Sequence, residues 1–130
     1  MREPLWIESE ETLAIHDMML AQHGGLAGVR DQGLLDSALS RPRNAFHHGQ
    51  RSLFRLAGAY AGGIIQNHPF NDGNKRTGFL VAATFLEVNG LTLRAPESEV
   101  VAATVALAGR ELSEVAYSKW LEANCDMGED

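Results

Sequence analysis

The stretch from His68 to Gly78 holds most of the side chains in this chain that could do chemistry. It reads His-Pro-Phe-Asn-Asp-Gly-Asn-Lys-Arg-Thr-Gly and precedes a strongly apolar run. The pattern predicts a helix start with Asn71 or Asp72 as the cap. Lys75 and Arg76 then fall in the first turn, where the helix dipole disfavours cations. Because helix amino ends bind phosphate through free N–H groups, we interpret this stretch as a phosphate site.

His68 could act as a general base at this site. Histidine titrates near neutral pH, so its imidazole can accept a hydroxyl proton. Pro69 disfavours helical geometry at the residue before it, so His68 is expected just past the end of a helix. Asp72 either caps the next helix or binds Mg²⁺, and Asn74 either caps that helix or binds phosphate. Phe70 is expected to anchor the loop in the core.

Other catalytic motifs fail on residue type or spacing. The run from Gly73 to Thr77 lacks the contiguous Gly-Lys-Ser/Thr of a P-loop. An EF-hand aligned on Gly73 would need Phe79 as its bidentate carboxylate. No Gly-x-Ser-x-Gly nucleophile motif occurs. The other histidines lack metal-ligand spacing, and we interpret Cys125, the single cysteine, as an inert thiol.

Composition limits the possible classes of function. The 130 residues are 45% hydrophobic and 22% charged, which suits one soluble domain at 1–126 with a disordered tail at 127–130. The net charge of −6 argues against direct nucleic-acid binding. No apolar run reaches the ~20 residues of a membrane span, and no signal peptide is visible. A lone cysteine suits the cytoplasm, which is the expected location.

Periodicity and capping residues predict an all-α fold of about six helices. The expected ranges are Ser9–His23, Asp31–Arg41, Ser52–Asn67, Gly73–Asn89, Glu97–Ala108 and Ser113–Ala123, with Ser9 and Ser113 as caps. The loop from His68 to Asp72 therefore lies between two central helices. Pro42 is expected to end the second helix, and residues 44–50 are expected to form a polar loop. Leu5–Ile7 and Leu91–Leu93 could pair as short strands.

The two helices that flank the loop are expected to form the core. The run Phe79–Leu86 is apolar on nearly all sides apart from Thr84, which predicts a buried central helix. Gly58, Gly62 and Gly63 in the preceding helix each cost about 1 kcal/mol relative to alanine. Their presence predicts close packing against another helix or a ligand.

The segment His68–Arg76 resembles the signature of the Doc (death on curing) toxins, a branch of the Fic/Doc superfamily. That signature reads His-x-Phe-x-Asp/Asn-Ala/Gly-Asn-Lys-Arg. Its fixed positions are all satisfied here, by His68, Phe70, Asp72, Gly73, Asn74, Lys75 and Arg76. Further stretches similar to Doc sequences are Gly24–Asp31, Gly33–Ala38 and Arg41–Pro42. The resemblance covers most of the chain and implies a single compact Fic/Doc-type helical domain.

Two positions distinguish the chain from the Fic branch. Fic enzymes carry His-Pro-Phe-x-x-Gly-Asn-Gly-Arg-x-x-Arg, whose second glycine and last arginine serve a diphosphate. Lys75 and Phe79 stand at those places here. The resemblance therefore implies the Doc reaction, in which the γ-phosphate of ATP is transferred to a Ser or Thr hydroxyl of a host translation factor. The expected target is elongation factor Tu, and the expected effect is inhibition of translation. AMP transfer by the same site is the alternative.

The same resemblance implies a role for each residue of the signature. His68 would deprotonate the target hydroxyl, and Asp72 would hold Mg²⁺. The nucleotide phosphates would be bound at the helix start by Gly73, Asn74, Lys75 and Arg76, of which the two cations would also stabilise transition-state charge. The expected cofactors are ATP and Mg²⁺. The expected partners are a host protein and a small antitoxin whose disordered tail folds onto the toxin.

Two alternatives from other classes stay open beside the phosphotransferase. The chain could be a degenerate, non-catalytic domain that binds a nucleotide or an antitoxin, although the intact His68 speaks against this. A helical metal-dependent phosphohydrolase is the other alternative, and it would need further His and Asp ligands.

Overall fold

The computed structural model describes residues 2–126, so the tail expected at 127–130 lies outside the described residues. Within that range the elements are α1 (Ser9–His23), α2 (Gln32–His47), α3 (Leu53–Asn67), α4 (Asn74–Val88), β1 (Thr92–Leu93), α5 (Glu97–Ala108), α6 (Glu114–Ala123) and β2 (Cys125–Asp126). The two short strands pair antiparallel. The all-α prediction is confirmed. Among the described residues, no helix is long and apolar enough to cross a bilayer.

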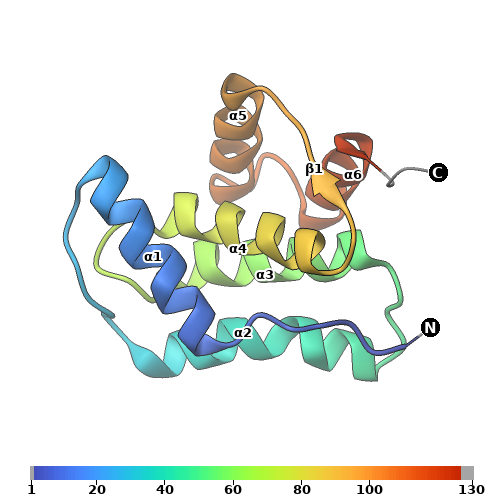
Figure 1. The fold of residues 1–130 in the computed structure, drawn as a ribbon, viewed down its shortest axis with the longest axis horizontal. Coiled ribbons are helices and arrows are strands. Elements are labelled where there is room, and N and C mark those ends of the chain that lie inside the picture. Colours follow the sequence, from blue (N-terminus) through green and yellow to red (C-terminus); the bar gives the residue numbers. More distant parts are fainter. Residues whose placement is uncertain (1, 127–130) are drawn as a thin grey trace.

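Helices α2, α4, α5 and α6 pack around α3, whereas α1 packs mainly on α4. Figure 1 shows α3 and α4 side by side through the centre, with α2 along one flank and α5 and α6 on the opposite one. Every residue of α3 from Leu56 to Ile65 is buried, so α3 is enclosed on all sides. The prediction that α4 is a central helix is confirmed, but its run Phe79–Leu86 is fully buried on one face only. Val81 and Phe85 are buried, whereas Leu80 is half-buried because the outer face of α4 borders a cleft.

Glycines of α3 let the neighbouring helices approach closely, as predicted. A Cβ on Gly63 would lie 3.2 Å from the Cα of Ala38 in α2. A Cβ on Gly62 would lie 2.1 Å from Oε2 of Glu114 in α6. The Glu114 carboxylate accepts hydrogen bonds of 2.9 and 3.0 Å from Arg41 of α2. An ion pair thus links α2 to α6 directly over Gly62 of α3, where the absence of a side chain lets the Glu114 carboxylate approach the helix.

Pro42 does not end α2, contrary to the prediction. The helix continues to His47, and it includes the first part of the expected polar loop at 44–50. A buried stripe at helical spacing runs along the helix through Leu35, Ala38, Pro42 and Phe46. The Phe46 ring also meets Trp6 edge-on, with 5.8 Å between centroids. Burial of this stripe outweighs the ~3 kcal/mol cost of an internal proline.

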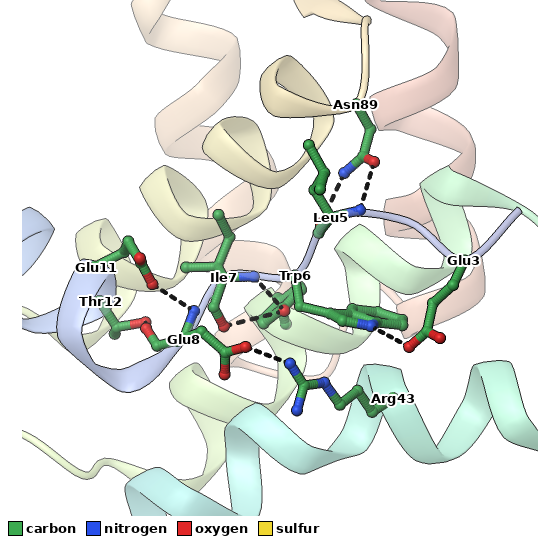
Figure 2. A network of polar contacts seen from close by, with 10 residues as sticks. Glu3, Leu5, Trp6, Ile7, Glu8, Glu11, Thr12, Arg43 and Asn89 are labelled. Carbon is green, nitrogen blue, oxygen red and sulfur yellow. Dashed lines mark hydrogen bonds and ion pairs between the residues drawn. The ribbon is translucent and has the colours of Figure 1, made fainter.

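The segment around Leu5 and Ile7 does not pair with residues 91–93, because side chains already satisfy its backbone. Asn89 exchanges two hydrogen bonds of 2.9 Å with the backbone of Leu5. The Tyr60 hydroxyl accepts from the Ile7 N–H at 2.8 Å and donates to the Ile7 carbonyl at 3.1 Å. Figure 2 shows how this network ties the segment to the helices. The predicted strand pairing is therefore wrong, and β1 takes β2 as its partner.

Of two helix caps predicted from the sequence, the one at α1 is wrong and the one at α6 is confirmed. α1 is capped by Glu8 instead of Ser9, and the Glu8 N–H donates to the Glu11 carboxylate at 2.8 Å. This reciprocal arrangement is a capping box with glutamate in the place that serine or threonine usually takes. Ser113 caps α6 as predicted, and its hydroxyl accepts from the Ala116 N–H at 3.0 Å.

Candidate active site

The loop from His68 to Gly73 joins α3 to α4 and begins in a left-handed conformation. His68 follows α3 directly, as predicted, with φ of 52° and ψ of 55°. Such angles are uncommon for a residue other than glycine. Arg30 holds this backbone through Nε, which donates to the His68 carbonyl at 2.8 Å, and through Nη2, which donates to the Asn67 carbonyl at 3.0 Å. His68 itself is exposed. Its backbone is therefore fixed while its imidazole is open to solvent.

The loop lies against the segment that connects α1 to α2. Val29 and Phe70 form an antiparallel bridge. On either side of it, the Arg30 N–H donates to the Pro69 carbonyl at 2.7 Å and the Asn71 N–H to the Gly28 carbonyl at 3.0 Å. Figure 1 shows the connection and the loop at the same end of the helices. Phe70 is only 1% exposed, so its ring attaches the loop to the core.

Asn74 closes the loop with its side chain. Its Oδ1 accepts from the Phe70 N–H at 2.9 Å, and its Nδ2 donates to the Phe70 carbonyl at 3.0 Å. Asn74 is buried. Because the side-chain amide is engaged with the peptide of Phe70, the group that Asn74 can offer an anion is its backbone N–H. Phosphate binding by Asn74 stays a prediction, and only its backbone N–H is free to make that contact.

Gly73 caps α4, whereas Asn71 or Asp72 was expected to do so. Gly73 has φ of 78°, which glycine adopts without strain. The Asn71 side chain instead donates to the Ala27 carbonyl at 3.0 Å. The Asp72 carboxylate accepts from the Gly73 N–H at 2.9 Å and from the Leu26 N–H at 3.2 Å. The two expected caps therefore join the loop to the segment between α1 and α2.

The amino end of α4 presents amide N–H groups that have no protein acceptor. Within residues 2–126, the N–H groups of Asn74, Lys75 and Arg76 are unpaired. The Thr77 N–H is the first to bond within the helix, to the Gly73 carbonyl at 2.9 Å. Unpaired amides carry the positive end of the helix dipole. Lys75 and Arg76 lie in this first turn, as predicted, and are exposed. The unpaired amides and the two cations together favour binding of an anion at the amino end of α4.

These groups border a cleft of about 550 Å³ between α1, α4 and α5. Clefts of this size hold small ligands. Its polar end is lined by Asp72, Gly73, Asn74, Lys75 and Arg76, and its apolar wall includes Phe79, Leu80, Val101 and Val105. His68 is not among the lining residues. The structure thus brings together the predicted residues from Asp72 to Arg76, whereas His68 does not line the cleft.

Arg76 contacts both neighbouring helices of the cleft. Its Nη1 lies 3.3 Å from Nε2 of His23 on α1 and 4.0 Å from Oε2 of Glu97 on α5. An ion pair this exposed contributes about 0–1 kcal/mol. Arg76 can therefore exchange Glu97 for another anion at little cost.

A magnesium ion at Asp72 would need oxygen atoms from a ligand. No three His, Cys, Asp or Glu side chains within residues 2–126 cluster closely enough to hold a metal by themselves. Asp72 is exposed and borders the cleft beside the free amides. Mg²⁺ commonly takes one or two carboxylates together with substrate phosphates. Asp72 therefore fits a cation that arrives with a nucleotide, and the donor set does not favour a metal-dependent phosphohydrolase.

Two residues that hold the loop were not among the predicted site residues. Arg30 fixes the backbone of His68, as described above, and its signal in the sequence was its place in a stretch similar to Doc sequences. His16 is buried and its Nε2 lies 2.9 Å from the Asp72 carbonyl oxygen. A signal for His16 existed, because it shares one face of α1 with Thr12 and Met19 at helical spacing. A polar residue on a buried face needs a hydrogen-bond partner.

Cys125 lies on β2 and takes no part in the cleft. Burial, together with the carboxylates of Asp126 and Glu122, raises the pKa of its thiol. A raised pKa leaves little thiolate at neutral pH, and the thiolate is the reactive form. This environment agrees with the interpretation of Cys125 as inert.

The sequence is similar to one known protein family and to two named relatives. The sequence model of the Fic/DOC family matches residues 6–86, a range that includes the whole loop and most of α4. The protein kinase doc of Escherichia phage P1 is 32% identical over 108 residues, which are 82% of this chain and 85% of the phage protein. The toxin Doc of Mycolicibacterium smegmatis is 45% identical over 75 residues, 55% of this chain and 57% of that toxin. Since the match covers more than half of the sequence and includes the loop that α3 and α4 position, the chain belongs to the Fic/Doc family.

Proposed function

We propose that this chain is the toxin of a toxin–antitoxin pair, and that it transfers the γ-phosphoryl group of ATP to a Ser or Thr hydroxyl of a host protein. The expected target is elongation factor Tu, so that translation is inhibited. The observation that carries the proposal is the amino end of α4, where unpaired amides, Lys75 and Arg76 border one cleft with Asp72. The names of the two relatives, a protein kinase and a toxin, support it.

The nucleotide phosphates would bind at the polar end of the cleft. The amides from Asn74 to Arg76 are fixed donors that need no rearrangement when charge develops on the phosphoryl oxygens. Lys75 and Arg76 would neutralise the charge that spreads over the transferred group. Asp72 would hold Mg²⁺, which when bound neutralises the phosphate oxygens. Arg76 would leave Glu97 for the phosphates, because their exposed pair is weak.

His68 would take the proton of the attacking hydroxyl. The hydroxyl oxygen forms a bond to the γ-phosphorus, the bond from that phosphorus to the β–γ bridging oxygen breaks, and ADP leaves. The proton resides on the imidazole until water removes it. His68 is exposed and lies outside the lining of the cleft. We therefore expect the target protein to approach over the loop from solvent while the nucleotide occupies the cleft.

AMP transfer is the alternative reaction of the same site. It needs close contact between the protein and a diphosphate, which the resemblance assigns to a glycine and an arginine in the Fic branch. Lys75 occupies the glycine position here, and Phe79 contributes an apolar, half-buried ring to the cleft at the arginine position. Both residues favour phosphoryl transfer.

The decisive experiment follows the label from ATP to the target. Purified protein is incubated with Mg²⁺, elongation factor Tu and ATP labelled at either the α or the γ position, and intact masses are measured. We expect the target to gain one phosphoryl group, with label only from the γ position. A gain of one AMP would establish the alternative reaction. ATP binding without transfer to this factor or to any protein of a bacterial extract would favour the non-catalytic domain.

His68→Ala tests the general base within the same assay. Transfer should fall about 10²–10⁴-fold, the usual contribution of such a base, while circular dichroism and thermal melting stay close to wild type. His47→Ala is the matched control, because His47 is also an exposed histidine at a helix end. A folded His68→Ala protein with full activity would exclude His68 as the base.

A binding measurement tests the anion site separately. Mg²⁺ and ATP should raise the melting temperature, because a ligand that binds only the folded protein stabilises it. At a hundredfold excess of ATP over Kd, the free energy of unfolding should increase by about 2.7 kcal/mol. Lys75→Gln with Arg76→Gln should abolish this rise, and added salt should weaken it in the wild type. Arg55→Gln with Lys119→Gln removes the same charge from exposed positions outside the cleft and should leave the rise intact. Equal shifts for both double variants would contradict the phosphate site.

The antitoxin would cover the apolar wall of the cleft. Val101 and Val105 of α5 are 46% and 53% exposed, and Phe79 and Leu80 of α4 border the same cleft. Such an apolar stripe can accept a disordered segment that folds on binding. Val101→Glu with Val105→Glu should weaken the affinity for the antitoxin, measured by calorimetry. An unchanged affinity would place the antitoxin on another face.

A further inference from the structure

The buried face of α1 contacts the loop through a histidine outside the signature motif. His16 is 2% exposed and stacks on Phe70, with 3.9 Å between ring centroids and 9° between ring planes. Phe70 is the residue whose ring attaches the loop to the core. His16 therefore forms part of the surface on which the loop rests.

The edge of the same imidazole makes a directional contact. Nε2 of His16 lies 2.9 Å from the carbonyl oxygen of Asp72. A carbonyl oxygen can only accept a hydrogen bond, so Nε2 must carry a proton. The next residue is Gly73, where a Cβ would lie 2.1 Å from Cε of Met19, also on α1. α1 thus contacts the loop at Phe70, Asp72 and Gly73.

We propose that His16 is a positioning residue that sets the direction of the Asp72 carboxylate and of the amino end of α4. Its ring fixes Phe70, and its Nε2–H fixes the carbonyl of Asp72. Histidine suits both contacts, because it combines an aromatic face with an N–H donor at its edge. The inference rests on the proposed function for the reaction that His16 serves, whereas the contacts with the loop are independent of that reaction.

Two substitutions separate the contacts. His16→Phe keeps an aromatic face for Phe70 and removes the donor to Asp72. His16→Gln loses the aromatic face and keeps a side-chain N–H that can reach the same carbonyl. Thr12→Val is the matched control, because Thr12 lies on the same buried face and bonds only to the Glu8 carbonyl of its own helix, at 2.9 Å.

The first readout is phosphoryl transfer. We expect His16→Phe to lower kcat about 10–100-fold, the usual effect of removing a partner that orients a metal ligand, while KM for the target protein changes little. His16→Gln should recover a large part of this loss. Thr12→Val should keep wild-type kcat even where its melting temperature falls as far as that of His16→Phe. Equal kcat values for the Phe and Gln variants would overturn the role of the hydrogen bond.

The second readout does not depend on activity. Amide hydrogen exchange of Phe70, Asn71 and Thr77, whose N–H groups are hydrogen-bonded within the loop and at the start of α4, should become faster in His16→Phe and stay close to wild type in Thr12→Val. A folded His16→Phe protein with unchanged exchange there would overturn the inference. If no variant and no wild-type protein transfers phosphate, the proposed function fails, and the exchange result still decides the role of His16. Nitrogen NMR of the wild type completes the test, because an imidazole without a proton on Nε2 would also overturn it.

Discussion

Replacement of Asn74 by alanine distinguishes a residue that builds the loop from one that binds phosphate. The Asn74 side chain makes two hydrogen bonds to Phe70, one to its N–H at 2.9 Å and one to its carbonyl at 3.0 Å. Phe70 is 1% exposed. Asn74→Ala therefore leaves both backbone groups of a buried residue without their partner.

The size of the effect follows from these two groups. A buried donor or acceptor left unsatisfied costs about 1–3 kcal/mol. Partial entry of water at the loop favours the lower half of that range, so we expect a loss of about 3 kcal/mol in the free energy of unfolding. A domain of this size should then melt about 10 °C lower. Asn74→Asp should lose less, because its carboxylate can still accept from the Phe70 N–H.

Urea unfolding and thermal melting of the ligand-free protein measure this loss. Asn124→Ala is the control, because Asn124 makes one side-chain hydrogen bond, of 2.9 Å to the Trp120 carbonyl, at the end of α6. It should cost about 1 kcal/mol. If Asn74→Ala is as stable as wild type and loses only nucleotide binding, the side chain serves the phosphate, and our account of the loop is refuted.

Three further predictions concern the framework around the site. Gly62→Ala displaces the end of the partly exposed Glu114 side chain, so loss of its pair with Arg41 (about 0–1 kcal/mol) and the better helix propensity of alanine (about 1 kcal/mol) should nearly cancel in urea unfolding, and a loss above about 2 kcal/mol would show that Glu114 cannot move. Burial raises the pKa of Tyr60 to about 12. Between about pH 10 and pH 12 the phenol therefore ionises in the unfolded chain but not in the folded protein. The stability that the neutral phenol contributes is complete below pH 10 and is lost by about pH 12, at about 1.4 kcal/mol per pH unit. Tyr60→Phe should flatten this alkaline decrease, as followed by melting temperature against pH, and an unchanged slope would argue against the shift. Arg30→Met frees the backbone of His68, so kcat should fall about 10–100-fold with a small change in melting temperature, and full activity would show that His68 needs no support.

Local chemistry was sufficient for most helix boundaries. α5 has the predicted range, and α3, α4 and α6 each begin one residue after their predicted starts. These helices have clear stop signals and amphipathic or apolar patterns, which act within a few residues. The position of His68 just past the end of α3 follows in the same way from Pro69, whereas its left-handed φ of 52° does not, because a residue before proline favours extended backbone.

The predicted secondary structure is wrong at two places, and in both the cause is a contact between segments far apart in the sequence. Pro42 should end α2 by local rules, yet the burial of a whole helix face keeps the helix intact. The backbone of Leu5 is satisfied by Asn89, so the expected strand does not form. Neither effect is encoded within one segment, because each depends on a partner that only the folded chain supplies.

The candidate site likewise has features that local sequence predicts and features that depend on contacts between distant segments. From the residues alone one could predict that a loop follows α3 and that Lys75 and Arg76 lie in the first turn of the next helix, because turn residues, a proline and a helix start act locally. Only the tertiary structure decided that the Asn74 side chain faces Phe70, that Arg30 holds His68, and that His16 meets Asp72. The physical reason is that a buried polar group takes its partner from whichever element packing brings within about 3 Å.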